Sequence, residues 1–245
     1  MRGYGAVMLL QAALNGPWTK DDHPGVPISA EELARDAVAC VAAGAKAIHL
    51  HPRDRGGSER LDAEVIDHVA VTVRDACGVP VGVSTGAWIE PDVQRRTELV
   101  RAWSGPDYAS VNVSEDGALE IMRALLDAGV GIEAGVWSVE DARRLAGWRL
   151  GEQLTRVLVE PVDVDPRGAV ALMDDIHQAL DEAGIAAPRL QHGDGDATWV
   201  LIEDAVRRGL DTRVGLEDTQ YDPDGERVAS NQALVRSARR IMVRA

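Results

Sequence analysis

The sequence predicts a single (β/α)₈ TIM barrel, and three observations support this fold class. Short apolar or β-branched runs alternate eight times with longer amphipathic segments, and no segment is left over. Strands that alternate with helices pair in parallel, because each return to the sheet needs a crossover. Eight such units in 245 residues fit the usual size of this barrel. No linker or low-complexity tract divides the chain, so we expect one domain over residues 1–245.

The first strand and helix have the clearest local signals. The apolar run AVMLLQAAL, residues 6–14, is too short to cross a bilayer and lacks a cleavage site after its basic start, so it predicts a buried first strand rather than a leader. Ser29 and Glu32 have the spacing of a capping box, and Gly44 suits a helix end. A helix is therefore expected from Ser29 to Gly44.

The remaining elements follow the same rhythm. After the first, the predicted strands are apolar runs at residues 45–51, 79–85, 107–113, 130–136, 156–162, 187–193 and 211–217. The amphipathic segments between and after them predict helices at residues 62–76, 91–103, 116–128, 139–148, 168–184, 196–208 and 228–244. A doubly wound sheet is the alternative, but it would need a glycine-rich phosphate turn after the first strand, and ALNGPWTKDD is not one.

Composition narrows the function. The formal net charge is −14, and such a surface repels phosphate backbones, so neither nucleic acid nor an anionic membrane is expected as a partner. The two cysteines, Cys40 and Cys77, fall within or at the end of stretches that read as helical, and they lack metal-binding spacing. We expect both to be reduced structural thiols in a cytoplasmic protein.

Polar side chains gather where the predicted strands end, which is where barrels build their active sites. In AIHLHPRD, residues 47–54, the two-residue period of a strand puts His49 and His51 on one face. In RVGLED the same period turns Arg213 and Glu217 inward. The second and eighth strands are separated only by the first, about 10 Å at the usual spacing. Two imidazoles and a carboxylate that share one ion form a catalytic zinc arrangement, and other divalent metals also fit.

Each of these signals also has an ordinary structural explanation. The two histidines and Glu217 could belong to the polar rim of the barrel, and Arg213 could simply neutralise a neighbouring carboxylate. His192, in QHGDGD, could be a further ligand, a substrate contact or a loop residue. Other polar residues lie at the predicted strand ends: Asn15, Arg53, Asp54, Ser84, Thr85, Asn112, Ser114, Glu115, Glu133, Trp137, Glu160, Gln191, Asp194 and Asp218.

The segments LNGPWTKDDHPGVPIS, HLHPRD, VGVSTG, RVGLEDT and SNQALV, in this order, resemble the β-keto acid cleavage enzymes, such as the 3-keto-5-aminohexanoate cleavage enzyme. The resemblance spans essentially the whole chain. It implies a (β/α)₈ barrel that holds Zn²⁺ or another divalent metal through His49, His51 and Glu217. It also implies condensation of a small β-keto acid with acetyl-CoA, which releases acetoacetate and a new acyl-CoA.

The resemblance further assigns roles to single residues. Asp218 would be the base, Arg213 would assist the base and the substrate, and Ser84 or Thr85 together with Asn112 would line the substrate pocket. A homo-oligomer, a dimer or tetramer, is expected. The alternatives are another metal-dependent TIM-barrel hydrolase or lyase, or a non-catalytic metal-binding barrel.

The first loop departs from some members of that family. Pro17 stands where they carry an acidic residue that contacts an amino group of the substrate, so a 5-amino keto acid is not the expected substrate. Trp18 and Trp88 either wall the site and favour an apolar or aromatic tail, or simply pack. Lys20 and Arg53 are the cations considered for contacts with CoA.

Overall fold

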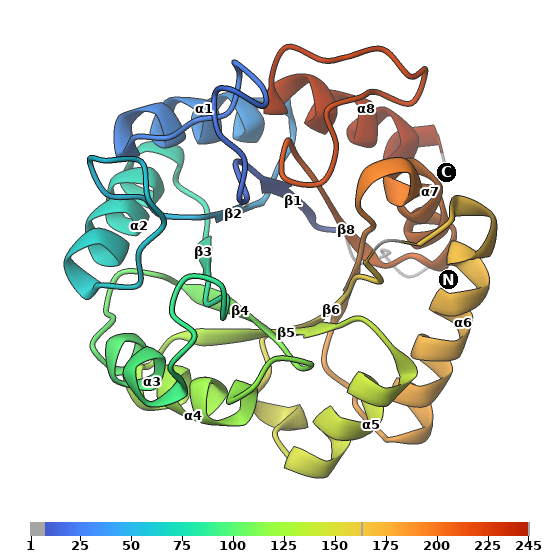
Figure 1. The fold of residues 1–245 in the computed structure, drawn as a ribbon. Helices are drawn as coiled ribbons and strands as arrows, with labels where there is room; N and C mark the ends of the chain where they lie inside the picture. Colours follow the sequence, from blue (N-terminus) through green and yellow to red (C-terminus); the bar gives the residue numbers. More distant parts are fainter. Residues whose placement is uncertain (1–7, 163, 245) are drawn as a thin grey trace, which may run out of the picture.

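The barrel predicted from the sequence is confirmed in the computed structural model, which describes residues 8–162 and 164–244. Eight parallel strands close in the order β1 to β8, with β8 pairing back to β1, and the helices surround them (Figure 1). The strands are β1 Leu10–Ala13, β2 Ala47–Leu50, β3 Val81–Ser84, β4 Tyr108–Asn112, β5 Gly131–Val136, β6 Arg156–Val159, β7 Arg189–Gln191 and β8 Asp211–Val214.

The helices also follow the predicted order. They are α1 Ala30–Ala43, α2 Ala63–Cys77, α3 Val93–Arg101, α4 Ala118–Ala128, α5 Val139–Trp148, α6 Pro166–Glu182, α7 Thr198–Arg208 and α8 Asn231–Arg244. Two short 3₁₀ turns, Gly151–Gln153 and Gly195–Ala197, were not predicted. The capping box at α1 is present, since Ser29 Oγ accepts from the Glu32 N–H and the Glu32 carboxylate accepts from the Ser29 N–H.

All eight strands are shorter than predicted, because the apolar runs continue into turns. The predicted first strand, residues 6–14, contains β1, and its residues 6 and 7 lie outside the described part of the chain. The predicted sixth strand, 156–162, ends at Val159, two residues before Pro161, which has no N–H to donate to a ladder. The predicted eighth strand, 211–217, ends at Val214, and the backbone N–H groups of Asp218 and Thr219 both donate to Gly215 O.

The barrel interior is packed by side chains of alternate strand residues. Gln11 Nε2 donates to Tyr108 Oη at 3.1 Å and to Glu133 Oε1 at 2.9 Å, and Arg156 Nε lies 3.2 Å from the same Glu133 oxygen. Gly82 leaves room for the Tyr108 ring, which an added Cβ would approach to 1.9 Å. This buried polar layer lies beneath the residues at the strand ends and supports them from below.

Cys40 is buried and Cys77 is half-buried, and neither forms a disulfide in the structure. No helix within the described residues combines the length and the apolar character needed to cross a bilayer.

Candidate active site

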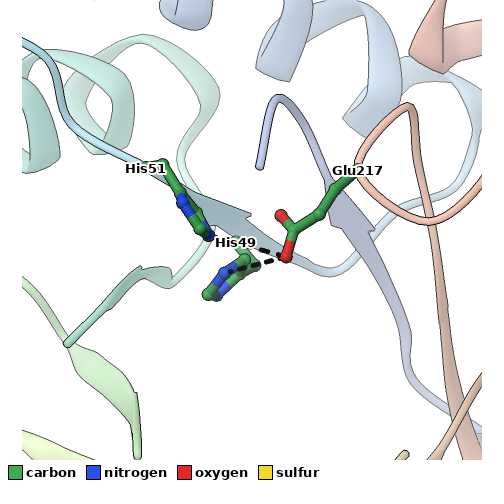
Figure 2. A group of neighbouring side chains, drawn as sticks. All are labelled: His49, His51 and Glu217. Atoms are coloured by element: carbon green, nitrogen blue, oxygen red, sulfur yellow. Dashed lines mark ion pairs between the residues drawn. The ribbon is translucent and has the colours of Figure 1, made fainter. Parts of the chain in front are cut away.

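The three predicted metal ligands lie together at the carboxyl ends of β2 and β8. Glu217 Oε1 is 3.5 Å from His49 Nε2 and 3.6 Å from His51 Nε2. One ligand atom from each residue can be chosen so that all three lie within 4.8 Å of one another. The side chains point toward a common centre (Figure 2). The predicted convergence of these residues is therefore present in the structure.

Two glycines allow Glu217 to take this position. A Cβ on Gly215 would lie 1.7 Å from Ala13 O, so only glycine lets the turn after β8 run this close to β1. Gly16 has φ +51°, and a Cβ there would meet Glu217 Cγ at 2.5 Å. The carboxylate thus reaches the histidines from a turn, and not from the strand that the sequence pattern predicts.

The electrostatics of the cluster favour positive charge at its centre. Burial lowers the pKa of His49 to about 3. Burial also lowers the pKa of His51, but the Glu217 and Glu59 carboxylates outweigh it and raise that pKa to about 9. Burial favours the neutral acid at Glu217, yet Arg213 and the two histidines hold its pKa well below the usual range. Glu217 is therefore an anion that lies beside a neutral His49 ring and a protonated His51 ring.

The donor set fits a divalent metal. Glu217 Oε2 is a buried atom without a hydrogen-bond partner, and such an atom costs free energy unless something else satisfies it. Two imidazole nitrogens and a carboxylate are the ligands of several catalytic zinc sites, and mixed nitrogen and oxygen donors also suit other divalent ions. His49, His51 and Glu217 would be the residues that hold the ion.

Arg213 joins the cluster to the predicted base. Its Nη2 lies 2.6 Å from Glu217 Oε1 and 2.7 Å from Asp218 Oδ1, and its Nε lies 3.1 Å from the same Asp218 oxygen. Burial raises the pKa of Asp218, although the Arg213 guanidinium acts in the opposite direction. A carboxylate with a raised pKa, beside a candidate cation site, is suited to accept a proton.

His192 belongs to a separate polar group on the neighbouring wall. Its Nε2 lies 2.7 Å from Glu160 Oε2, and its Nδ1 lies 3.7 Å from Asp218 Oδ1. Trp137 Nε1 donates to the other Glu160 oxygen at 3.1 Å. Of the three interpretations left open by the sequence, the position of His192 on the cavity wall fits a substrate contact.

Two of the three predicted substrate contacts line the cavity beside the cluster, and the third does not. Ser84 and Asn112 line the cavity. The Ser84 hydroxyl accepts from the Gly86 N–H at 3.2 Å, and Asn112 Nδ2 donates to Glu115 Oε1 at 2.8 Å. Thr85 is not among the lining residues, because its hydroxyl donates to Ser110 O at 2.7 Å and ties β3 to β4.

A cavity of about 360 Å³ opens beside the cluster. Three sets of side chains line it. The candidate metal ligands and the adjoining pair are His49, His51, Glu217, Arg213 and Asp218. The other polar residues are Ser84, Ser110, Asn112, Glu160, His192 and Asp194, and the apolar wall consists of Pro17, Trp18, Trp88, Trp137, Leu158, Pro161 and Val162. Its volume is within the range of small-molecule sites. The two cations considered for CoA do not line it, and Arg53 donates to Gly16 O, Gly57 O and Trp18 O.

Glu59 is a site residue that the sequence reasoning missed. Its Oε1 lies 2.8 Å from His51 Nδ1, and its Oε2 accepts from Trp88 Nε1 at 2.7 Å. The Trp88 ring stacks on the His51 ring, with centroids 6.0 Å apart. The available signal was the pair Gly56–Gly57, which folds the segment after β2 into a turn and pairs Glu59 with Arg53.

Comparison with known proteins decides the family. The family model described as beta-keto acid cleavage enzyme matches residues 8–245. The chain belongs to the beta-keto acid cleavage enzyme family. The chain is 26% identical to a 3-keto-5-aminohexanoate cleavage enzyme of Fusobacterium nucleatum subsp. nucleatum, over 93% of this chain and 88% of that protein. It is 25% identical to the enzyme of the same name from Acetoanaerobium sticklandii, over 96% of this chain and 91% of that protein.

One solved structure of a different enzyme has a fold similar to that of this chain. The N-acetylmannosamine-6-phosphate 2-epimerase from Clostridium perfringens superposes with a TM-score of 0.56 at 12% identity, covering 87% of this chain and 89% of that one. This likeness concerns the barrel alone. The family supports an enzyme that cleaves β-keto acids, and the His-His-Glu cluster is compatible with a divalent metal.

Proposed function

We propose that this protein condenses a small β-keto acid with acetyl-CoA in a metal-dependent reaction that yields acetoacetate and a new acyl-CoA. The observation that supports it most directly is the juxtaposition of the His49, His51 and Glu217 cluster with the Arg213–Asp218 pair, in a chain of this family. Zinc is the proposed ion, and other divalent metals are possible.

The bound ion would act as a Lewis acid toward the ketone and carboxylate oxygens of the keto acid and so stabilise developing negative charge. His49, His51 and Glu217 would hold it. Glu59 would orient His51 through the bond to Nδ1, which leaves Nε2 directed at the ion. The unpartnered Oε2 of Glu217 supplies a further ligand position.

Asp218 is the proposed base. It would remove a proton from C2, the carbon between the ketone and the carboxylate, and later return a proton to the product. Arg213 keeps the Asp218 carboxylate beside the cluster through its Nε and Nη2 donors. Ser84 and Asn112, with Thr85 behind them, are the proposed substrate contacts.

The reaction balances without a protein nucleophile. C2 of the deprotonated keto acid attacks the acetyl carbonyl, and the C–S bond of acetyl-CoA breaks. The released CoA thiolate attacks the original ketone carbon, and the bond between that carbon and C2 breaks. The acyl group R–CO leaves on CoA, and C2, which now carries the acetyl group and the carboxylate, takes a proton to become acetoacetate.

The two rival functions differ in testable ways. A hydrolase of the amidohydrolase type needs further histidines on the fifth and sixth strands, and neither GIEAGV nor RVLV contains one. A non-catalytic barrel would bind metal without producing acetoacetate. We also propose that the enzyme is cytoplasmic and forms a homo-oligomer, a dimer or tetramer.

The decisive experiment combines metal analysis with a substrate panel. Purified protein is analysed by plasma mass spectrometry, and β-keto acids are then supplied with acetyl-CoA while acetoacetate and the new acyl-CoA are followed. We expect about one metal per chain and formation of both products in equal amounts. Treatment with a chelator should abolish turnover, and Zn²⁺ should restore it. Metal-loaded protein that forms neither product from any keto acid would contradict the proposal.

A further inference from the structure

The cavity is bordered by apolar side chains that face solvent. Within the described residues, six large hydrophobic side chains are exposed, and three of them, Trp18, Trp88 and Val162, line this cavity. Their exposed fractions are 39%, 54% and 43%. Such a concentration of exposed apolar surface around one concavity indicates a binding surface, because isolated exposed residues would be scattered.

The indole rings of this wall are fixed by hydrogen bonds. Trp18 Nε1 donates to Glu217 O at 3.0 Å, Trp88 Nε1 to Glu59 Oε2 at 2.7 Å, and Trp137 Nε1 to Glu160 Oε1 at 3.1 Å. Each polar N–H is therefore already used, and the ring carbons remain to contact a ligand. Rings held in place before binding lose little conformational entropy when the ligand arrives.

The acidic groups of the cavity are already engaged. Glu160 binds His192 and Trp137, and both Glu217 and Asp218 bind Arg213. Asp194, the fourth acid of the lining, also interacts with a neighbour. A cationic substrate tail would therefore have to compete for a carboxylate, whereas an apolar tail would meet Pro17, Leu158, Pro161 and Val162 as well as the indoles.

We propose that this wall, made of Pro17, Trp18, Trp88, Trp137, Leu158, Pro161 and Val162, binds the substituent R of the β-keto acid. The substrates are then 3-oxo acids with an uncharged apolar tail. This inference rests on the proposed function and adds the substrate class. It differs from the amino-bearing substrate named for the two relatives described above.

A panel of 3-oxo acids tests the tail preference. We expect kcat/KM to rise roughly three- to fourfold for each methylene added to an alkyl tail until the cavity is filled. Acids of matched length whose tails end in an amino, trimethylammonium or carboxylate group should be at least about tenfold poorer. A charged tail that is used as well as or better than its alkyl counterpart would overturn the inference.

A matched pair of substitutions locates the effect. Val162→Glu places a new carboxylate on the wall. Val38→Glu makes the same change at a side chain of nearly equal exposure, 44% against 43%, on α1 away from the cavity. Val162→Glu should lower kcat/KM for 3-oxohexanoate at least about tenfold and shift the preference toward the 5-amino analogue. Val38→Glu should change neither kcat/KM nor the substrate preference. Identical behaviour of the two variants would refute the proposed role of the wall in binding the substrate tail.

A binding measurement separates this inference from the proposed function. Without acetyl-CoA, zinc-loaded protein is titrated with 3-oxohexanoate and with 5-amino-3-oxohexanoate while tryptophan fluorescence is followed, because three of the six tryptophans line the cavity. Tighter binding of the alkyl acid supports the wall even if no keto acid is turned over. If the enzyme turns over keto acids but binds 5-amino-3-oxohexanoate more tightly than 3-oxohexanoate, the proposed function stands and the proposed role of the apolar wall is refuted.

Discussion

His51 lies between two carboxylates, with its Nδ1 2.8 Å from Glu59 Oε1 and its Nε2 3.6 Å from Glu217 Oε1. The bond to Glu59 fixes the ring orientation and keeps a proton on Nδ1, so Nε2 is the nitrogen that would bind a metal once it gives up its own proton. Glu59, which is not itself a proposed ligand, therefore orients the proposed ligand His51.

Glu59→Gln tests this arrangement. The amide keeps the size of the side chain but removes the charge, so we expect the affinity for Zn²⁺ to fall roughly 10- to 100-fold. Competition against a chromophoric chelator measures it. Glu98→Gln, an exposed change on α3, serves as the control and should bind Zn²⁺ like the parent protein. An unchanged affinity in Glu59→Gln would show that His51 needs no orienting partner.

His49→Ala and Asp218→Asn should separate metal binding from proton transfer. His49→Ala removes a proposed ligand, so we expect the purified protein to lose its metal and its activity. Asp218→Asn keeps the size of the side chain and one oxygen that can accept from Arg213, but the amide cannot take up a proton, so the metal should stay while kcat falls by at least about 10²-fold. Metal content and turnover are measured on the same preparations. Full turnover and retained metal in His49→Ala would refute the ligand assignment.

Arg213→Lys should reduce activity although the positive charge is conserved. The guanidinium reaches Glu217 and Asp218 at once, whereas a single ammonium group cannot reproduce that fork. Loss of orientation at the base should lower kcat roughly 10²-fold. Metal content measured in parallel distinguishes a displaced base from a damaged metal site. A kcat close to that of the parent would mean that Arg213 supplies charge alone.

Asp36 should make stability depend on pH. Burial raises its pKa from the ordinary 3.8 to about 6, although Asn231 Nδ2 donates to its Oδ2 at 2.6 Å. The folded protein therefore binds more protons than the unfolded chain between these two values. Stability then falls as pH rises through this window, and above pH 6 the folded state contains a poorly solvated charge.

Asp36→Asn removes that charge and keeps an oxygen for Asn231. We expect the variant to be more stable than the parent at pH 7.5 by an amount on the order of 1–2 kcal/mol, and the difference should shrink toward pH 4. Urea unfolding at both pH values measures it. The exposed Asp127→Asn should behave like the parent at each pH. A difference that grows on acidification would reverse the predicted sign.

The sequence was sufficient to predict the barrel and the shared face of His49 and His51, because both depend on strand periodicity. The resemblance to the family, together with the neighbouring positions of the second and eighth strands, pointed to Glu217 as their partner. The length of β8 could not be predicted in the same way. Leu216 is apolar and buried, so it extends the alternating pattern past Val214 although the backbone has already turned. Glu217 reaches the site because Gly215 and Gly16 permit a close approach, and that approach depends on atoms far apart in sequence.

The role of Glu59 was not predictable for a similar reason. It lies outside any strand, and its position depends on how the turn after β2 folds back over His51. Thr85 illustrates a different case. It directly follows Ser84, which lines the cavity, but its hydroxyl donates to Ser110 O on β4, so its proposed role as a substrate contact stays a prediction.

Two tryptophans that would contact the substrate also form hydrogen bonds with the candidate metal site. Trp18 Nε1 donates a hydrogen bond to the backbone oxygen of Glu217, and Trp88 Nε1 donates one to Glu59, whose carboxylate contacts His51. Replacement of either tryptophan to accommodate a different substrate tail would also remove a hydrogen bond that holds a residue of the candidate metal site or its neighbour Glu59. Engineering of new specificities should therefore begin at Val162 or Pro161, where no such hydrogen bond is lost. Variants at the indoles will need compensating changes elsewhere to keep His49, His51 and Glu217 in position.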